Sequence, residues 1–161
     1  RDSRGYNASA VEMCRFLVKN LEYIDPQTMK HKEKLAFWIN IHNALVMHGY
    51  LRYGTQSYTR CNMVMQASYN VGGTLVTAHD IRDFILGISR SRSSLLWLQA
   101  LVSLRKHRKV STAKHPFAVL KPEPLAHFGL STGMNSDPAV RVYRGGRVLE
   151  DLRRAREEFV R

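Results

Sequence analysis

Apolar residues follow one another with little interruption over 35–53, and they occupy every side of a helix drawn through them. A helix that is apolar all round is buried all round. The pattern therefore predicts a central buried helix over 31–53, with Gly54 as its stop. Asn40 and Asn43 lie three residues apart on one face of it, and buried side chains of this kind need hydrogen-bond partners.

Shorter patterns predict the other elements of the fold. Two β-prone runs, 68–71 and 74–77, flank Gly72-Gly73, a pair that is typical of a two-residue hairpin turn. Alternating residues predict a further, half-buried strand over 139–143. Apolar residues at helical spacing predict four more helices, over 9–24, 78–88, 94–106 and 147–160. The sequence thus predicts one α+β domain over 1–161, mostly helical, with a small antiparallel sheet around the buried central helix.

Two of the predicted helices begin with a capping signal. Ser9 and Glu12 have the spacing of a capping box, in which each side chain bonds to the other residue's backbone N–H. Thr77, followed by Ala78, His79 and Asp80, likewise indicates a helix cap directly after the hairpin.

The chain is strongly basic, with 25 lysines and arginines against 13 acidic residues and a net charge of +12. This excess favours an acidic partner, either a nucleic acid, an anionic membrane surface or an acidic protein, although acidic segments flanking this one would also balance it. Over 90–114 basic residues occur with no acidic residue among them, and the densest group is Arg105, Lys106, Arg108 and Lys109. These residues predict either a solvated helix end or a patch that contacts anions.

The cysteines and the apolar run indicate the cellular compartment in which the protein is found. Two cysteines, Cys14 and Cys61, do not form a disulfide framework, so we expect a reducing, intracellular environment with both as buried free thiols. The run over 35–53 holds too many polar residues for a membrane span, and no signal-peptide pattern opens the chain. We therefore expect a cytoplasmic or nuclear protein.

Cofactor and metal motifs are missing from the sequence. It contains no phosphate-binding glycine loop, no dinucleotide fingerprint and no zinc-protease motif. Its seven histidines are scattered without the spacing of metal ligands. We therefore predict neither a metal nor a cofactor.

Three polar residues form the best candidate for catalysis. His127 could act as a base, Ser131 as a nucleophile and Asn43 as the group that orients the imidazole. His127 and Ser131 point the same way whether residues 127–131 form a helix or a strand. The alternative is that His127 and Asn43 satisfy buried backbone groups around the central helix.

Arg141 is the candidate binding residue outside the basic run. It follows the turn at 135–138 and could hold a carboxylate or a phosphate with two hydrogen bonds. Alternatively, it pairs with a neighbouring acidic side chain.

Three blocks of sequence carry a resemblance to a known family. They are KLAFWINIHNALVMH at 34–48, ASYNVGG at 67–73 followed by Asp80-Ile81, and EPLAHFGLSTG at 123–133 followed by SDPAVRVY at 136–143. In this order and spacing, the chain resembles the plant branch of the domain-of-unknown-function 547 family. The resemblance spans nearly the whole chain. Members usually continue beyond the last helix, so we expect the domain to be truncated after Arg161.

The resemblance also bears on function. Members often carry an N-terminal leucine zipper of the ternary complex factor type, which implies a partner-binding role in plant cytoplasm or nucleus, but this chain contains no zipper. The family commonly has Tyr where His42 stands and often has Cys in the segment of Ser131-Thr132. Bacterial relatives have Cys there and again near Asp137. If those thiols are reactive in relatives, this chain lacks that chemistry.

Three hypotheses about function follow, in order of preference. The first is a non-catalytic protein-interaction module with a basic face. The second is a hydrolase or acyl-transfer enzyme that uses His127 and Ser131. The third is a nucleic-acid binder acting through 90–114, whose affinity would fall steeply with salt.

Overall fold

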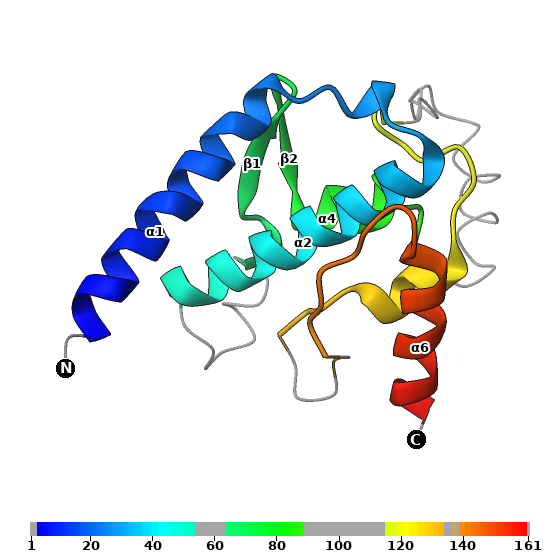
Figure 1. Cartoon of the computed structure of the whole chain (residues 1–161). Coiled ribbons are helices and arrows are strands. Elements are labelled where there is room, and N and C mark those ends of the chain that lie inside the picture. Colours follow the sequence, from blue (N-terminus) through cyan, green and yellow to red (C-terminus); the bar gives the residue numbers. More distant parts are fainter. Residues whose placement is uncertain (1–2, 54–63, 89–114, 134–136, 138, 161) are drawn as a thin grey trace, which may run out of the picture.

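The structure is a computed structural model, and it describes residues 3–53, 64–88, 115–133, 137 and 139–160. The described elements, shown in Figure 1, are α1 (Ser3–Asn20), η1 (Leu21–Tyr23), η2 (Pro26–Thr28), α2 (His31–Tyr53), β1 (Ser68–Val71), β2 (Thr74–Thr77), α4 (Ala78–Asp80), η3 (Ile81–Ile85), η4 (Pro124–Gly129) and α6 (Val148–Val160). The predicted α+β class is confirmed, with helices around one two-stranded antiparallel sheet. The predicted helix over 94–106 lies outside the described residues.

Helix α2 runs through the middle of the molecule, between the hairpin and α6 (Figure 1). Leu35, Trp38, Ile39 and Leu45 have no exposed surface and lie on one side of the helix, whereas Met47 and Leu51 on the other side are 55% and 81% exposed. The predicted central helix over 31–53 is therefore confirmed, but its predicted burial on every side is wrong, because Met47 and Leu51 are exposed. Burial of each of the fully buried side chains stabilises the fold by about 1.5–3 kcal/mol, which explains why this helix organises the core.

Strands β1 and β2 form the predicted hairpin. Tyr69 pairs with Val76 in the antiparallel register, and Val71 and Val76 are fully buried. Gly72 and Gly73 have φ angles of 56° and 77°. A two-residue turn with positive φ at both positions matches the twist of the strands, and glycine adopts it without steric cost.

The helical segment after the hairpin starts where the sequence places it. The Thr77 hydroxyl accepts a hydrogen bond from the Asp80 N–H, and an Asp80 carboxylate oxygen accepts one from the Thr77 N–H, so the capping box is complete. The chain then widens into the π-helical turn η3. The helix expected over 78–88 is therefore shorter than predicted: its α-helical part is Ala78–Asp80, and the π-helical turn ends at Ile85.

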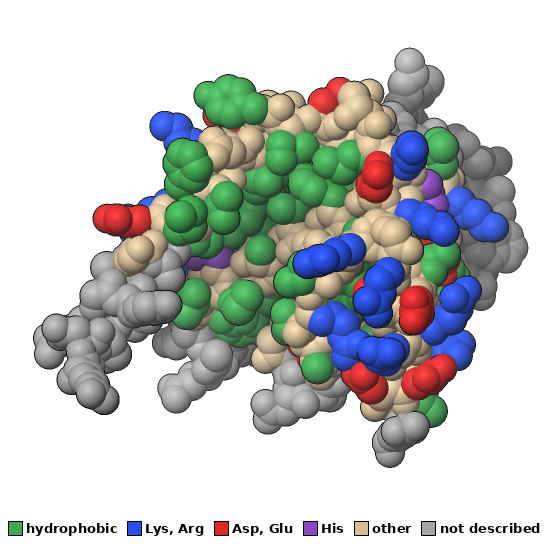
Figure 2. All heavy atoms as spheres, viewed as in Figure 1, with side chains coloured by type: hydrophobic (Ala, Val, Ile, Leu, Met, Phe, Trp, Pro, Cys, Tyr) green, Lys and Arg blue, Asp and Glu red, His purple; other side chains and the backbone are tan. Residues whose placement is uncertain are grey.

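Helix α1 differs from the prediction at its start and in its burial. It begins at Ser3, so Ser9 and Glu12 lie inside the helix and form no cap at its start. Phe16 and Leu17 are 61% and 57% exposed, because α1 leans away from the rest of the molecule (Figure 1). Figure 2 shows hydrophobic side chains gathered on the face between α1 and α2. Cys14 is exposed on this helix, so its predicted burial is wrong.

The predicted strand over 139–143 is also wrong. This segment is extended but belongs to no sheet among the described residues. The Asn40 side chain takes the place of a neighbouring strand, because its Nδ2 donates to the Tyr143 carbonyl at 2.8 Å and its Oδ1 accepts from the Tyr143 N–H at 2.9 Å. Val140 and Val142 face solvent, whereas Tyr143 is buried.

None of the helices in the described part of the chain combines the length and the apolar character needed to cross a membrane.

Candidate functional site

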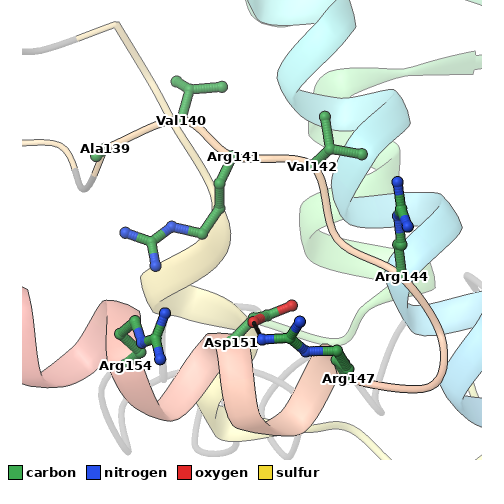
Figure 3. A pocket seen from close by; sticks show the side chains of 8 residues that line it. All are labelled: Ala139, Val140, Arg141, Val142, Arg144, Arg147, Asp151 and Arg154. Atoms are coloured by element: carbon green, nitrogen blue, oxygen red, sulfur yellow. Dashed lines mark ion pairs between the residues drawn. The ribbon is translucent and has the colours of Figure 1, made fainter.

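A groove lies between the extended segment before α6 and the helix itself. Its volume is about 430 Å³, and Figure 3 shows the side chains that line it. They are Ala139, Val140, Arg141, Val142, Arg144, Arg147, Asp151 and Arg154. We call it the arginine groove, because four of its eight lining residues are arginines and one is acidic.

Two anchors position the walls of the groove. Asn40 of α2 holds the backbone of Tyr143, so the segment before α6 is fixed to the central helix. Helix α6 buries Val148, Leu152 and Ala155 on one face, next to the face that borders the groove. Positions 147, 151, 154 and 158 have the spacing of a single helix face. Packing of the apolar face therefore turns this charged face toward the groove.

The arginines of the groove differ in their ion pairs. Arg141 pairs with Glu158, and Arg147 lies 3.8 Å from Asp151, at the edge of ion-pair distance. Arg144 and Arg154 make no ion pair within the described residues. Arg141 and Arg147 are thus matched by carboxylates, whereas Arg144 and Arg154 are not.

The shape of the groove is visible in two views. In Figure 3, Arg141 points from the extended segment toward α6, and Arg154 points from α6 toward that segment. Arg144 stands at the opposite end, next to Val142. Figure 2 shows Lys and Arg side chains gathered over α6, with Asp and Glu side chains among them. A groove with this lining can bind an anion, and its valines add apolar contact.

The sequence hypothesis made Asn43 the residue that orients the His127 imidazole, whereas the structure places it in a buried cluster with His42 and Ser131, which we call the Asn43 cluster. The Asn43 Nδ2 donates to the Gly129 carbonyl at 2.8 Å, and its Oδ1 accepts from the Ser131 N–H at 2.9 Å. The Nδ1 atom of His42 lies 3.2 Å from the same oxygen. The predicted alternative, in which His127 and Asn43 both satisfy buried backbone groups, agrees with these contacts for Asn43 but is wrong for His127, which is exposed.

These bonds also fix the state of His42. Because Asn43 Oδ1 already accepts from the backbone, the His42 Nδ1 must carry a hydrogen and donate it, which leaves a lone pair on Nε2. That Nε2 is buried without a hydrogen-bond partner within the described residues. Burial lowers the pKa of His42 from 6.5 to about 4, against the opposing effect of the Asn43 hydrogen bond. His42 is thus a neutral, buried imidazole at neutral pH.

Ser131 and His127 have different surroundings. The Ser131 hydroxyl donates to the Asp137 carboxylate at 3.0 Å. Asp137 also accepts from the Thr132 and Gly133 backbone N–H groups. His127 is exposed and meets the ring of Phe128 edge to face. No hydrogen bond joins His127 to Ser131 in the described part of the chain, so the structure brings Asn43 to Ser131 but not His127.

The remaining predicted binding residues fall into two groups. Arg141 lines the arginine groove, and it also has the acidic neighbour that the alternative expected. Arg105, Lys106, Arg108 and Lys109 lie outside the described residues. No group of three or more His, Cys, Asp or Glu side chains in the described ranges is placed to hold a metal ion.

Sequence reasoning missed Arg144, Arg147 and Arg154 as groove residues, and it missed His42 as the imidazole that Asn43 contacts. The spacing of Arg147 and Arg154 on one helix face was a usable signal. Nothing in the sequence could show that Arg141 and Arg144 lie opposite that face, because this depends on how the segment before α6 packs on α2.

Of three comparisons with known proteins, one matched the chain. No curated protein matched it, and no solved structure matched it. A family model described as "Protein of unknown function, DUF547" matches residues 26–160, which is most of the chain and includes the arginine groove and the Asn43 cluster. On this match, the chain belongs to the DUF547 family.

Proposed function

We propose that this domain is a non-catalytic interaction module that binds an acidic segment of a partner protein in the arginine groove. The observation that carries the proposal is the charge of the groove, in which four arginines face one aspartate. Two of these arginines, Arg144 and Arg154, have no carboxylate partner within the described residues. A protein segment that supplies carboxylates would complete their hydrogen bonding.

The lining favours a peptide over a nucleic acid. Val140 and Val142 are 58% and 79% exposed at the groove, and none of the described residues that line it is aromatic. Single-stranded nucleic acids are usually bound by stacking their bases on aromatic rings. Exposed valines beside arginines instead suit a peptide with alternating acidic and apolar side chains.

The Asn43 cluster supports a non-catalytic role. Asn43 holds two backbone groups, and the Ser131 hydroxyl donates to a carboxylate rather than to an imidazole. A serine nucleophile is activated by a base that takes its proton, and a carboxylate is intrinsically a weaker base than an imidazole. The hydrolase hypothesis stays a prediction, and His127→Ala tests it by the loss of any esterase activity that the protein shows.

The binding of a short fluorescein-labelled peptide of alternating glutamate and leucine tests the proposal. Fluorescence polarisation would compare the unaltered chain with an Arg144→Gln, Arg154→Gln double variant. A hydrogen bond to a charged group contributes about 1.5–3 kcal/mol, and 1.4 kcal/mol is a factor of ten in affinity. The loss of one such bond would weaken binding about tenfold to a hundredfold, so we expect the double variant to bind at least about tenfold more weakly.

The matched control is an Arg153→Gln, Arg156→Gln double variant. These two arginines are exposed on α6 but do not line the groove, and their replacement removes the same net charge. The control should bind as the unaltered chain does. Equal weakening of both double variants would show that only the overall charge attracts the peptide, and the proposal would then be wrong.

The branch of the family to which the chain belongs and its cellular location are also part of this proposal. Membership of the plant, zipper-bearing branch and a cytoplasmic or nuclear location both fit a partner-binding module. The nucleic-acid hypothesis rests on 90–114. It predicts that deletion of this segment abolishes binding of an oligonucleotide but leaves binding of the acidic peptide intact.

A further inference from the structure

We infer that the arginine groove recognises a phosphorylated side chain, and that Glu158 occupies the phosphate position until the ligand displaces it. This inference rests on the proposed function and names the ligand class. The starting observation is that Arg141 and Arg154 point toward each other's element across one end of the groove (Figure 3). Glu158 is the ion-pair partner of Arg141 at that end.

The position of Glu158 allows a ligand to displace its carboxylate from Arg141. Glu158 lies one helical turn after Arg154 on α6, and its side chain is 46% exposed. An ion pair with an exposed partner contributes only about 0–1 kcal/mol. Its displacement by a stronger anion is therefore inexpensive, and Glu158 returns to water when released.

The charge of the ligand decides which anion binds Arg141 more strongly than Glu158 does. A glutamate of a partner protein would replace one carboxylate on Arg141 with another, so that contact gains little. A phosphate monoester carries about −1.5 to −2 charges at pH 7 and three acceptor oxygens. It can bond to Arg141 and Arg154 together, which a single carboxylate beside Arg141 does not do here.

The rest of the groove supplies the peptide contacts. Val140 and Val142 are exposed along the extended segment, and Arg144 lies at the end of the groove away from Arg154 (Figure 3). A phosphorylated residue bound between Arg141 and Arg154 would thus have apolar positions for its neighbours. Clusters of arginine are a recurrent means of recognising phosphorylated peptides.

The experiment compares two labelled peptides that differ at one position, phosphoserine in one and glutamate in the other, each flanked by leucines. Fluorescence polarisation would measure both against the unaltered chain, Glu158→Gln and Glu157→Gln. Glu157 is exposed and, unlike Glu158, forms no ion pair with Arg141 or any other described residue, so its replacement is the matched control for charge. We expect the phosphoserine peptide to bind at least about tenfold more tightly than the glutamate peptide. We expect Glu158→Gln, but not Glu157→Gln, to strengthen its binding several-fold.

Each other outcome overturns a defined part of the reasoning. If the two peptides bind equally, the phosphate inference is wrong and the proposed function stands. If the two glutamate variants behave alike, Glu158 does not compete for the site. If neither peptide binds, the proposed function fails with the inference. If a short oligothymidine displaces the phosphoserine peptide at lower concentration than unlabelled peptide does, a nucleic acid is the ligand and the inference is wrong.

Discussion

The buried imidazole of His42 makes the stability of the fold depend on pH. In the folded chain its pKa is lowered from 6.5 to about 4, first because burial removes the charged form from water. Arg82 lowers the pKa further, whereas Asp137 and Asp83 act in the opposite direction. Between about pH 6.5 and 4, His42 therefore binds a proton in the unfolded chain but not in the folded chain. Stability is thus full above pH 6.5, falls as the pH drops from 6.5 toward 4, and changes no further on this account below 4.

The magnitude follows from the same pKa values. A difference of one in a pKa equals 1.36 kcal/mol, so the fall from 6.5 to about 4 corresponds to about 3 kcal/mol. A whole domain is stable by only about 5–15 kcal/mol. This single residue can therefore remove a large part of the stability at pH 4.

The variant that isolates this effect is His42→Asn, whose amide can still donate to Asn43 Oδ1 but does not titrate. Urea unfolding at a series of pH values between 7.5 and 4 would measure the free energy of unfolding for both proteins. The variant should be less stable at neutral pH, because the shorter side chain leaves a cavity. Its stability should nevertheless fall less steeply between pH 6.5 and 4. Some slope will remain, because burial also lowers the pKa of His115.

A second measurement does not depend on how the variant folds. The ¹⁵N chemical shifts of the His42 ring report its protonation in the unaltered protein. We expect a hydrogen on Nδ1, none on Nε2, and no titration above about pH 5. An imidazole that titrates near pH 6.5 in the folded protein, or an unchanged pH slope in His42→Asn, would refute the reasoning.

Three further predictions concern the framework of the fold. Asn43→Ala leaves two buried backbone groups without a partner, and at about 1–3 kcal/mol for each the urea midpoint should fall accordingly; an unchanged midpoint would contradict the assigned bonds. Gly133→Ala places a Cβ 1.9 Å from the Tyr50 ring, whereas Gly73→Ala has open space at a similar positive φ. Thermal unfolding should therefore show about 1–3 kcal/mol of overpacking in the first variant beyond the backbone strain common to both, and equal losses would count against this account. Thr77→Ala removes a helix cap and should cost about 1 kcal/mol in urea unfolding, while a neutral result would mean that the cap does not stabilise α4.

Local signals predicted the elements that depend on local physics. The bounds of α2 and of the hairpin were predictable, because an all-round apolar run and a Gly-Gly turn each specify one conformation. The capping box at Thr77 was predictable for the same reason. The segment over 139–143 was not, because its alternation matches a strand while its backbone partner is the side chain of Asn40, distant in sequence.

The sequence by itself determined the α+β class, the central helix, the family and the excess of positive charge, since each depends on residue type and short-range spacing. Only the tertiary structure decided which charges meet. It set Arg141 opposite Arg154 across the groove and joined Asn43 to His42 and Ser131 rather than to His127. The physical reason is that these contacts depend on how α6, α2 and the segments between them pack. Packing follows from the burial of apolar faces over the whole chain, and no local pattern encodes it.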